Sequence, residues 1–325
     1  MKAWLFTAPD RPLELAELPD PTPADGEVVI DVRAAGLCHT DVAILEGTMP
    51  GYPLVSPLVL GHEIAGVVSA VGAGVTEFAP GDRVAALALP TDVTGAPGIG
   101  RHGGYAEKTV LHSSYVIPIA PGLDFAQAAA ATDAGATSYR AVITRGRVGK
   151  GTRVGIIGLG GLGMTGARIA VLAGAEVYAA EPVVDVHHLA MERGVKEVVR
   201  DISELASRDL EVIIDFAGVD TTGPAIAAAG HGARIVQVGV GRLHADFVIT
   251  DLIQKELELL GSAGMTLDDA TAVLELITSG DLTLLTTEIG FDEIGDGLER
   301  LRRGEVRGRL VAITPTSTGG GHDGR

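Results

Sequence analysis

The stretch RVGIIGLGGLG at residues 153–163 places an apolar run directly before a glycine-rich loop. The run RVGIIG (153–158) predicts a buried strand, and GLGMTGARIAVLAG (161–174) predicts a helix closed by Gly174. The loop between them matches G-x-G-x-x-G, and its strand–loop–helix setting is typical of a dinucleotide-binding turn. In such a turn Gly158 allows the tight bend, Gly160 lets the backbone approach a pyrophosphate, and Gly163 lets the helix pack closely on the strand. The free N–H groups at the helix start then favour an anion.

A carboxylate follows at the position where such a turn needs one. Glu181 ends the next predicted strand, EVYAA (176–180). There it can accept hydrogen bonds from both adenosine ribose hydroxyls and would repel a 2′-phosphate, which favours NAD over NADP. The alternative is a solvated acidic residue before a helix. The predicted cofactor-binding residues of this region are Gly158, Gly160, Gly161, Leu162, Gly163 and Glu181.

The pattern of predicted secondary structure changes at about Phe125. Before it, short β-type runs broken by Gly and Pro predict an antiparallel, barrel-like domain, at 27–36, 63–72, 82–89 and 105–112. After it, strands alternate with helices, which implies parallel βαβ units and a doubly wound sheet. The later segments of that pattern are a helix at 186–193 and strands at 211–218 and 233–241. Residues 298–304 predict a helix, 308–314 a returning strand, and the polar end of the chain a disordered tail.

Composition narrows the class of protein. The 325 residues are 46% hydrophobic and carry a net charge of −17, which repels phosphate backbones and argues against a nucleic-acid partner. No apolar run is long enough to span a bilayer, and the first residues lack the apolar segment of a signal peptide, so we expect a cytoplasmic protein. The single cysteine, Cys38, excludes an intramolecular disulfide and any cysteine-only metal site.

Two short motifs supply candidate metal ligands. Cys38-His39-Thr40-Asp41 and Gly61-His62-Glu63 lie in separate predicted loops of the N-terminal domain. Taken singly, a cysteine or a histidine is usually a packed residue. Together a thiolate and an imidazole suit Zn²⁺, which favours sulfur and nitrogen donors.

These motifs, in this order, resemble the zinc-containing alcohol dehydrogenase family of the medium-chain dehydrogenase/reductase superfamily over nearly the whole chain. The matching stretches are GLCHTD (36–41), GHEIAGVV (61–68), GDRV (81–84), GGYAE (103–107), AGATSYRA (134–141) and GLGGLG (158–163). The resemblance implies an α/β protein in which a Rossmann doubly wound parallel sheet is inserted into a GroES-like, barrel-like β-rich catalytic domain. The implied boundaries are 1–122 with a C-terminal return at 286–315 for the catalytic domain, 123–285 for the NAD-binding Rossmann domain, and 316–325 for the tail.

The resemblance also implies roles for single residues. Cys38 and His62 would be zinc ligands, and Thr40 would hydrogen-bond the substrate oxygen. Thr137 would pack against the nicotinamide ring, although it could equally cap a helix start. Arg309 would contact a cofactor phosphate, with a surface arginine as the alternative.

Three departures from the family pattern qualify these roles. Asp133 stands where relatives usually place a second cysteine ligand, so the expected zinc shell is Cys38, His62 and Asp133, with Glu63 as the alternative third ligand. The cysteines of a structural zinc are missing, which predicts one catalytic zinc and no structural one. Ala43 stands where many relatives have a histidine that passes protons to water.

The sequence therefore predicts a zinc-dependent, NAD(H)-linked alcohol dehydrogenase or carbonyl reductase acting on a small alcohol, aldehyde or ketone. One alternative is a zinc-independent NAD(P)H reductase of C=C, C=N or quinone substrates on the same fold. Another is a non-catalytic NAD(H)-binding module. The family resemblance further implies a homodimer or homotetramer. It does not identify the substrate.

Overall fold

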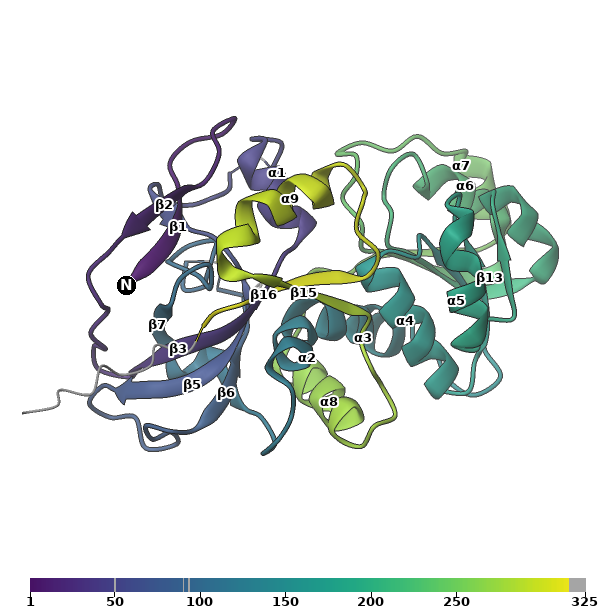
Figure 1. Ribbon diagram of the computed structural model, residues 1–325. Helices are drawn as coiled ribbons and strands as arrows, with labels where there is room; N and C mark the ends of the chain where they lie inside the picture. Colours follow the sequence, from purple (N-terminus) through teal and green to yellow (C-terminus); the bar gives the residue numbers. More distant parts are fainter. Residues whose placement is uncertain (50, 90, 93, 316–325) are drawn as a thin grey trace, which may run out of the picture.

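The computed structural model describes residues 1–49, 51–89, 91–92 and 94–315. Two lobes lie side by side, with the N-terminal strands in one and the middle of the chain in the other (Figure 1). Within the described residues, no helix has the length and apolar character needed to cross a bilayer. The predicted tail at 316–325 lies outside the described residues.

One lobe is built on a six-stranded parallel sheet in the order β11-β10-β9-β12-β13-β14. Its strands are β9 (Arg153–Ile157), β10 (Glu176–Ala180), β11 (Glu197–Val199), β12 (Leu210–Asp215), β13 (Ala229–Gln237) and β14 (Glu258–Gly261). Its connections carry α4 (Gly161–Leu172), η4 (Val184–Val186), α5 (His187–Glu192), η5 (Ile202–Arg208), α6 (Thr222–Ala228) and α7 (Ile249–Gln254). The chain runs outward from β9 in one direction and then, from β12, in the other. Ligands of doubly wound sheets bind at the carboxyl ends of the strands where this reversal occurs.

The second lobe holds a larger sheet in the order β15-β16-β3-β5-β6-β8, with β7 also paired to β3. Its strands are β3 (Glu27–Gly36), β5 (Glu63–Val71), β6 (Arg83–Ala86), β7 (Lys108–His112), β8 (Val116–Pro118), β15 (Thr286–Gly290) and β16 (Arg309–Ile313). A smaller sheet pairs β2 (Glu14–Glu17), β1 (Lys2–Phe6) and β4 (Leu58–Val59). The three sheets confirm the predicted fold class, a β-rich, barrel-like unit joined to a doubly wound parallel sheet.

Two predicted strands are shorter in the structure, because part of each segment hydrogen-bonds to a backbone outside the expected ladder. The expected strand at 105–112 becomes β7 only from Lys108, because the preceding backbone bonds elsewhere. Tyr105 N donates to Leu60 O at 3.0 Å, and Glu107 N donates to Lys2 O at 3.0 Å. The strand expected at 233–241 likewise stops at Gln237, after which Val238 N and Gly239 N both donate to Asp215 O.

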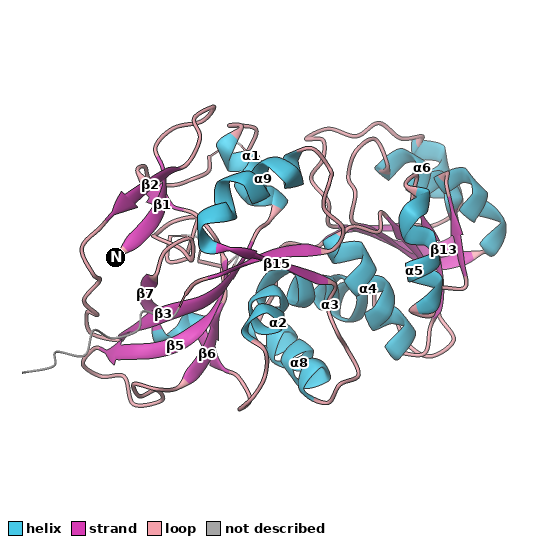
Figure 2. Ribbon diagram, in the orientation of Figure 1, coloured by secondary structure: helices cyan, strands magenta, loops and turns pink. Residues whose placement is uncertain are grey.

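A continuous helical stretch joins the two lobes. It consists of α2 (Phe125–Ala130), the π-helical turn η2 (Ala131–Gly135), α3 (Ala136–Tyr139) and a second π-helical segment η3 (Arg140–Arg145). Its α2 segment contacts β3, β5 and β16, and its α3 segment contacts α4 and α8 (Leu267–Thr278). Its buried alanines belong to the apolar core. Figure 2 shows α2 and α3 between the strands of the second lobe and the helices α4 and α8. Small residues let this helix approach both lobes, so one apolar core is continuous across the junction.

The C-terminal part of the chain returns to the first lobe. β16 pairs antiparallel with β3, with Ala312 opposite Ala35. Helix α9 (Ile294–Arg302), preceded by η6 (Phe291–Glu293), packs against α1 (His39–Leu45). This return brings the end of the described chain to the same strand that leads into Cys38.

Candidate metal and cofactor site

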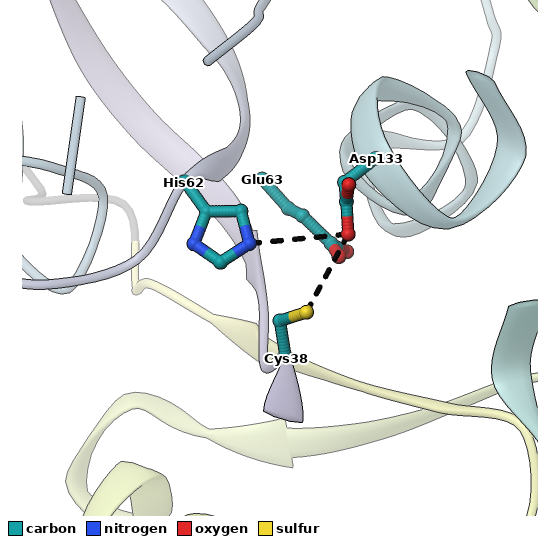
Figure 3. A group of neighbouring side chains, drawn as sticks. All are labelled: Cys38, His62, Glu63 and Asp133. Atoms are coloured by element: carbon teal, nitrogen blue, oxygen red, sulfur yellow. Dashed lines mark hydrogen bonds and ion pairs between the residues drawn. The ribbon is translucent and has the colours of Figure 1, made fainter. Parts of the chain in front are cut away.

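Four potential metal ligands converge where the two lobes meet. Cys38, His62, Glu63 and Asp133 each offer a sulfur, nitrogen or oxygen atom, and these atoms all lie within 4.8 Å of one another (Figure 3). Cys38 precedes α1, His62 and Glu63 lie at the start of β5, and Asp133 lies in η2. The structure thus brings together all four predicted ligand residues.

Strand pairing places Glu63 beside the cysteine loop. In the β3–β5 ladder Gly36 lies opposite Glu63. A Cβ atom on residue 36 would lie 1.9 Å from Glu63 Oε2, so only glycine leaves room for this side chain. The Glu63 carboxylate is fully buried as a result.

The carboxylate of Asp41 contacts both the Cys38 backbone and the His62 ring. Asp41 Oδ2 accepts hydrogen bonds from Cys38 N at 3.1 Å and from the Tyr105 hydroxyl at 2.8 Å. Asp41 Oδ1 lies 3.3 Å from His62 Nδ1, on the side of the ring away from Asp133. A carboxylate behind a metal-binding histidine orients the ring and raises its basicity.

Asp41 and Tyr105 join the candidate site through these contacts, although the sequence analysis gave neither residue a role. Asp41 stood in the quoted motif without a role. Its place three residues after Cys38, at the start of a short helix, is the capping-box position, and this was the available signal.

The π-helical turn η2 presents Asp133 to the other ligands. Its Oδ2 atom lies 3.5 Å from Cys38 Sγ and 3.9 Å from His62 Nε2. Its Oδ1 atom accepts a hydrogen bond from Thr137 Oγ1 at 2.9 Å. Single π-turns within α-helices occur frequently at functional sites.

Arg309 also lies in this cluster. The residue is only 3% exposed, and its Nη2 donates to Asp133 Oδ2 at 2.8 Å, with a closer ion pair to Glu63. Its Nη1 donates to Leu37 O at 3.3 Å. The side chain that the family pattern assigned to a cofactor phosphate is therefore directed at the two ligand carboxylates.

The buried charges shift one another's pKa values. Burial raises the pKa of Glu63 well above its usual range, assisted by Asp133 and Cys38 and opposed by Arg309. Burial acts the same way on Asp133, but Arg309 and His62 outweigh it and lower the pKa of that carboxyl. For His62, burial disfavours the charged ring, yet Asp41 raises the pKa of the imidazole well above its usual value.

The donor set fits a divalent metal ion. With Cys38 as thiolate and both carboxylates ionised, Cys38, Glu63, Asp133 and Arg309 carry charges that sum to minus two. Glu63 Oε1 pairs with Arg309, whereas Glu63 Oε2 is buried with no hydrogen-bond partner among the described residues. Such unsatisfied buried oxygens are costly unless another partner binds them. Sulfur, imidazole and carboxylate donors in one tight group are the ligand types of zinc.

The glycine loop lies at the carboxyl end of β9. Gly158 has a φ of +82°, and a Cβ on Gly163 would lie 1.8 Å from Gly158 O. Gly160 differs, because a Cβ there would meet no atom within 4 Å. Leu162, in the first turn of α4, is partly buried against the core. Gly161 lies against the backbone of Gly308, so the loop touches the segment that leads into Arg309.

Glu181 follows β10 and lies beside this loop. Its Oε2 accepts from Leu159 N at 2.8 Å, and its Oε1 accepts from Val183 N at 2.9 Å. The carboxylate is partly exposed and is held next to the phosphate-binding loop predicted from the sequence. This position suits a contact with the ribose of a dinucleotide.

Thr40 lies at the edge of the ligand cluster. Its Oγ1 atom is 3.7 Å from Cys38 Sγ, and the residue is partly exposed. A hydroxyl in this position can contact both solvent and a molecule bound at the cluster of candidate metal ligands. Ala43, on the same helix, supplies no titratable group.

Comparisons with known proteins match both lobes. A family model described as the alcohol dehydrogenase GroES-like domain matches residues 24–121, and one described as zinc-binding dehydrogenase matches residues 161–279. An alcohol dehydrogenase of Geobacillus stearothermophilus is 29% identical over 96% of this chain and 99% of its own length. An acryloyl-coenzyme A reductase of Metallosphaera sedula is 29% identical over 97% of this chain and 100% of its own length.

A solved structure extends the likeness to three dimensions. Acetophenone reductase from Geotrichum candidum, in complex with NAD, is similar with a TM-score of 0.88 and 30% identity, covering 96% of both chains.

Proposed function

The chain belongs to the zinc-containing alcohol dehydrogenase family of the medium-chain dehydrogenase/reductase superfamily, and from this premise we propose that it is a zinc-dependent enzyme for small alcohols, aldehydes or ketones. The family makes the chain an NAD-linked oxidoreductase. The observation that carries the finer proposal is the convergence of Cys38, His62 and Asp133, with Glu63 behind them. Within this proposal residues 1–122 and 286–315 form the catalytic domain and residues 123–285 the NAD-binding domain.

We assign the metal to Cys38, His62 and Asp133, with Glu63 as an exchangeable fourth ligand. Zinc bound there supplies a Lewis acid that lowers the pKa of a substrate hydroxyl or polarises a carbonyl. Asp41 holds the His62 ring so that Nε2 faces the other ligands. Arg309 offsets part of the negative charge of the two carboxylates.

Thr40 is the residue that we assign to proton transfer. Its hydroxyl lies beside Cys38, and its partial exposure gives it a route to water. During oxidation it would accept the proton of an alcohol while passing its own proton onward, and during reduction the relay would run in reverse. Since residue 43 is alanine, the onward path passes through water rather than through a histidine.

The cofactor assignment rests on the loop and on Glu181. A dinucleotide held there would supply hydride transfer, the oxidised form as acceptor and the reduced form as donor. The loop backbone and the start of α4 present N–H groups to the pyrophosphate, and Gly160 leaves its outer surface open. Glu181 would accept hydrogen bonds from the ribose hydroxyls and disfavour a 2′-phosphate.

Reduction of a conjugated C=C bond is the second candidate function. It is favoured by the likeness to acryloyl-coenzyme A reductase over nearly the full length of both chains. Alanine at position 43, in place of a histidine that passes protons to water, also favours this second candidate. A reductase of activated alkenes has different proton requirements from an alcohol dehydrogenase.

The test combines metal analysis with a substrate panel. Purified protein should contain about one zinc per chain, and removing it should abolish oxidation of simple alcohols with NAD. Asp133→Ala should lower zinc content as well as turnover, whereas retained zinc and activity would transfer the third-ligand role to Glu63 or water. A zinc-free preparation that is fully active on an enone but inactive on alcohols would favour the second candidate.

We also propose that the chain forms a homodimer through β14. This strand ends the parallel sheet in the observed order, and the adjoining helix α7 buries none of its residues. Large apolar side chains are exposed in α7 and in the segment that precedes it, namely Val240, Leu243, Val248, Ile249 and Ile253. Exposed apolar patches beside an open sheet edge are typical of subunit interfaces. Ile253→Glu should convert a dimer into a monomer in analytical ultracentrifugation, while Val184→Glu on a distant exposed site should not.

A further inference from the structure

The carboxylate of Asp133 is held at both oxygens by neighbouring side chains. Thr137 Oγ1 donates to Oδ1 at 2.9 Å, and Arg309 Nη2 donates to Oδ2 at 2.8 Å. Both partners are nearly inaccessible to solvent, with Thr137 5% exposed and Arg309 3% exposed. Building on the proposed metal site, we infer that Thr137 and Arg309 are positioning residues that enable an aspartate to serve as the third metal ligand.

The reason lies in the shape of the ligand. A thiolate presents one sulfur atom and needs no orientation beyond its Cβ position. A carboxylate has two oxygens and a broad terminal torsion, so its plane must be fixed by hydrogen bonds before one oxygen faces the metal. Thr137 occupies Oδ1 and leaves Oδ2 on the side of Cys38 and His62.

Local structure supplies both contacts. Asp133 and Thr137 are four residues apart, so they lie on one face where η2 passes into α3. Arg309 reaches the same carboxylate from β16 and also donates to Leu37 O, directly before Cys38. The guanidinium therefore ties the helix that carries Asp133 to the strand that leads to the cysteine.

The family pattern assigned these same two residues to the cofactor. A cofactor role alone gives no reason for either side chain to bond Asp133. A positioning role predicts that their effect on the metal depends on which residue occupies position 133, and this dependence can be measured.

The experiment is a double-mutant cycle read out as zinc affinity by chelator competition on the full-length protein. Thr137→Val, which keeps the shape of the side chain but loses the hydroxyl, should weaken zinc binding about 10- to 100-fold in the wild-type background. In the Asp133→Cys background the same change should leave zinc affinity unaltered. Thr137→Ser should retain the wild-type affinity, and Arg309→Lys should weaken it more when residue 133 is aspartate than when it is cysteine, since the arginine also pairs with Glu63.

Thr132→Val is the matched control. Thr132 is buried one residue before Asp133, but its hydroxyl donates to Ala129 O at 2.7 Å within its own helix. This variant should keep wild-type zinc affinity.

Two results would overturn the inference while leaving the proposed metal site in place. If Thr137→Val lowered NADH affinity but left zinc affinity unchanged, Thr137 would be a cofactor contact only. If it weakened zinc equally in both backgrounds, the effect would not pass through the carboxylate. A wild-type protein that binds no zinc would instead overturn the proposed function, and this inference with it.

Discussion

The glycine loop and the ligand cluster adjoin each other but are built in opposite ways. The loop comes from one continuous segment, and its main features are backbone features, such as the positive φ of Gly158 and the missing side chain of Gly163. The cluster draws on segments around residues 38, 62, 133 and 309, and its features are functional groups. Substitutions that add atoms should therefore disturb the glycine loop and its cofactor binding. Substitutions that remove a functional group should disturb metal binding by the ligand cluster.

The largest effect should follow the loss of a ligand. His62→Ala removes the imidazole that faces Cys38 and Asp133, leaving a cavity and one donor fewer. Zinc affinity should fall by more than the roughly 100-fold associated with outer contacts of a metal site. Metal analysis after dialysis, together with alcohol oxidation, measures this loss. Zinc content equal to that of the wild type would show that His62 is not a ligand.

A smaller loss of zinc affinity should follow when a residue that contacts a ligand, but is not a ligand itself, is changed. Asp41→Asn keeps the size of the side chain but removes the charge 3.3 Å from His62 Nδ1, so zinc affinity should fall about 10- to 100-fold. The pH dependence should change too. In the metal-free protein Asp41 raises the pKa of His62, so zinc must displace a proton and its affinity rises with pH until that pKa is passed.

In Asp41→Asn the pKa of His62 should be lower, so the rise in zinc affinity should level off at a lower pH. Titrations of zinc binding at several pH values would show this displacement. Identical pH profiles for the two proteins would mean that Asp41 does not act through His62.

The loop should respond to added atoms rather than to lost ones. Gly163→Ala places a methyl group against the carbonyl of Gly158, which should destabilise the protein by about 1–3 kcal/mol and weaken NADH binding. Gly160→Ala adds the same methyl group where no protein atom lies within 4 Å, so it should weaken NADH binding without changing the melting temperature. Equal melting temperatures for both variants would contradict this distinction.

The smallest expected effect concerns cofactor choice. Glu181→Gln keeps the size of the side chain and removes its charge, so repulsion of a 2′-phosphate disappears. The ratio of NADH to NADPH affinity should fall about tenfold, which corresponds to roughly 1.4 kcal/mol. Fluorescence titration with both cofactors measures it, and an unchanged ratio would remove Glu181 from cofactor discrimination.

The same difference in construction decides how much the sequence could predict. Strands β3, β9 and β10 and the start of α4 follow from local patterns of apolar and glycine residues, and the structure has them where those patterns placed them. The candidate ligands could be named because Cys38, His62 and Glu63 stand in short motifs. Asp133 was found only as a departure from a family pattern.

Contacts between segments distant in the sequence could not be predicted from local sequence patterns. The direction of the Arg309 side chain depends on the pairing of β16 with β3, which joins residues about 270 positions apart. The bond from Tyr105 to Asp41 depends on the turn that carries residues 103–107 past Gly61. The π-helical turn at Asp133 has no simple pattern of residues, because the packing of α2 and α3 between two lobes determines it.

Strand β16 is translated after all the other segments that form the site, and this affects how the newly made chain can fold on the ribosome. Cys38, His62 and Glu63 emerge early, but the cation that balances Glu63 and Asp133 belongs to the final strand of the described chain. Until Arg309 emerges, the two carboxylates lack their buried counter-charge, and closing this pocket would leave them uncompensated. Closure of the first lobe around these two carboxylates should therefore be a late event of biosynthesis, after the nucleotide-binding sheet has been translated in full.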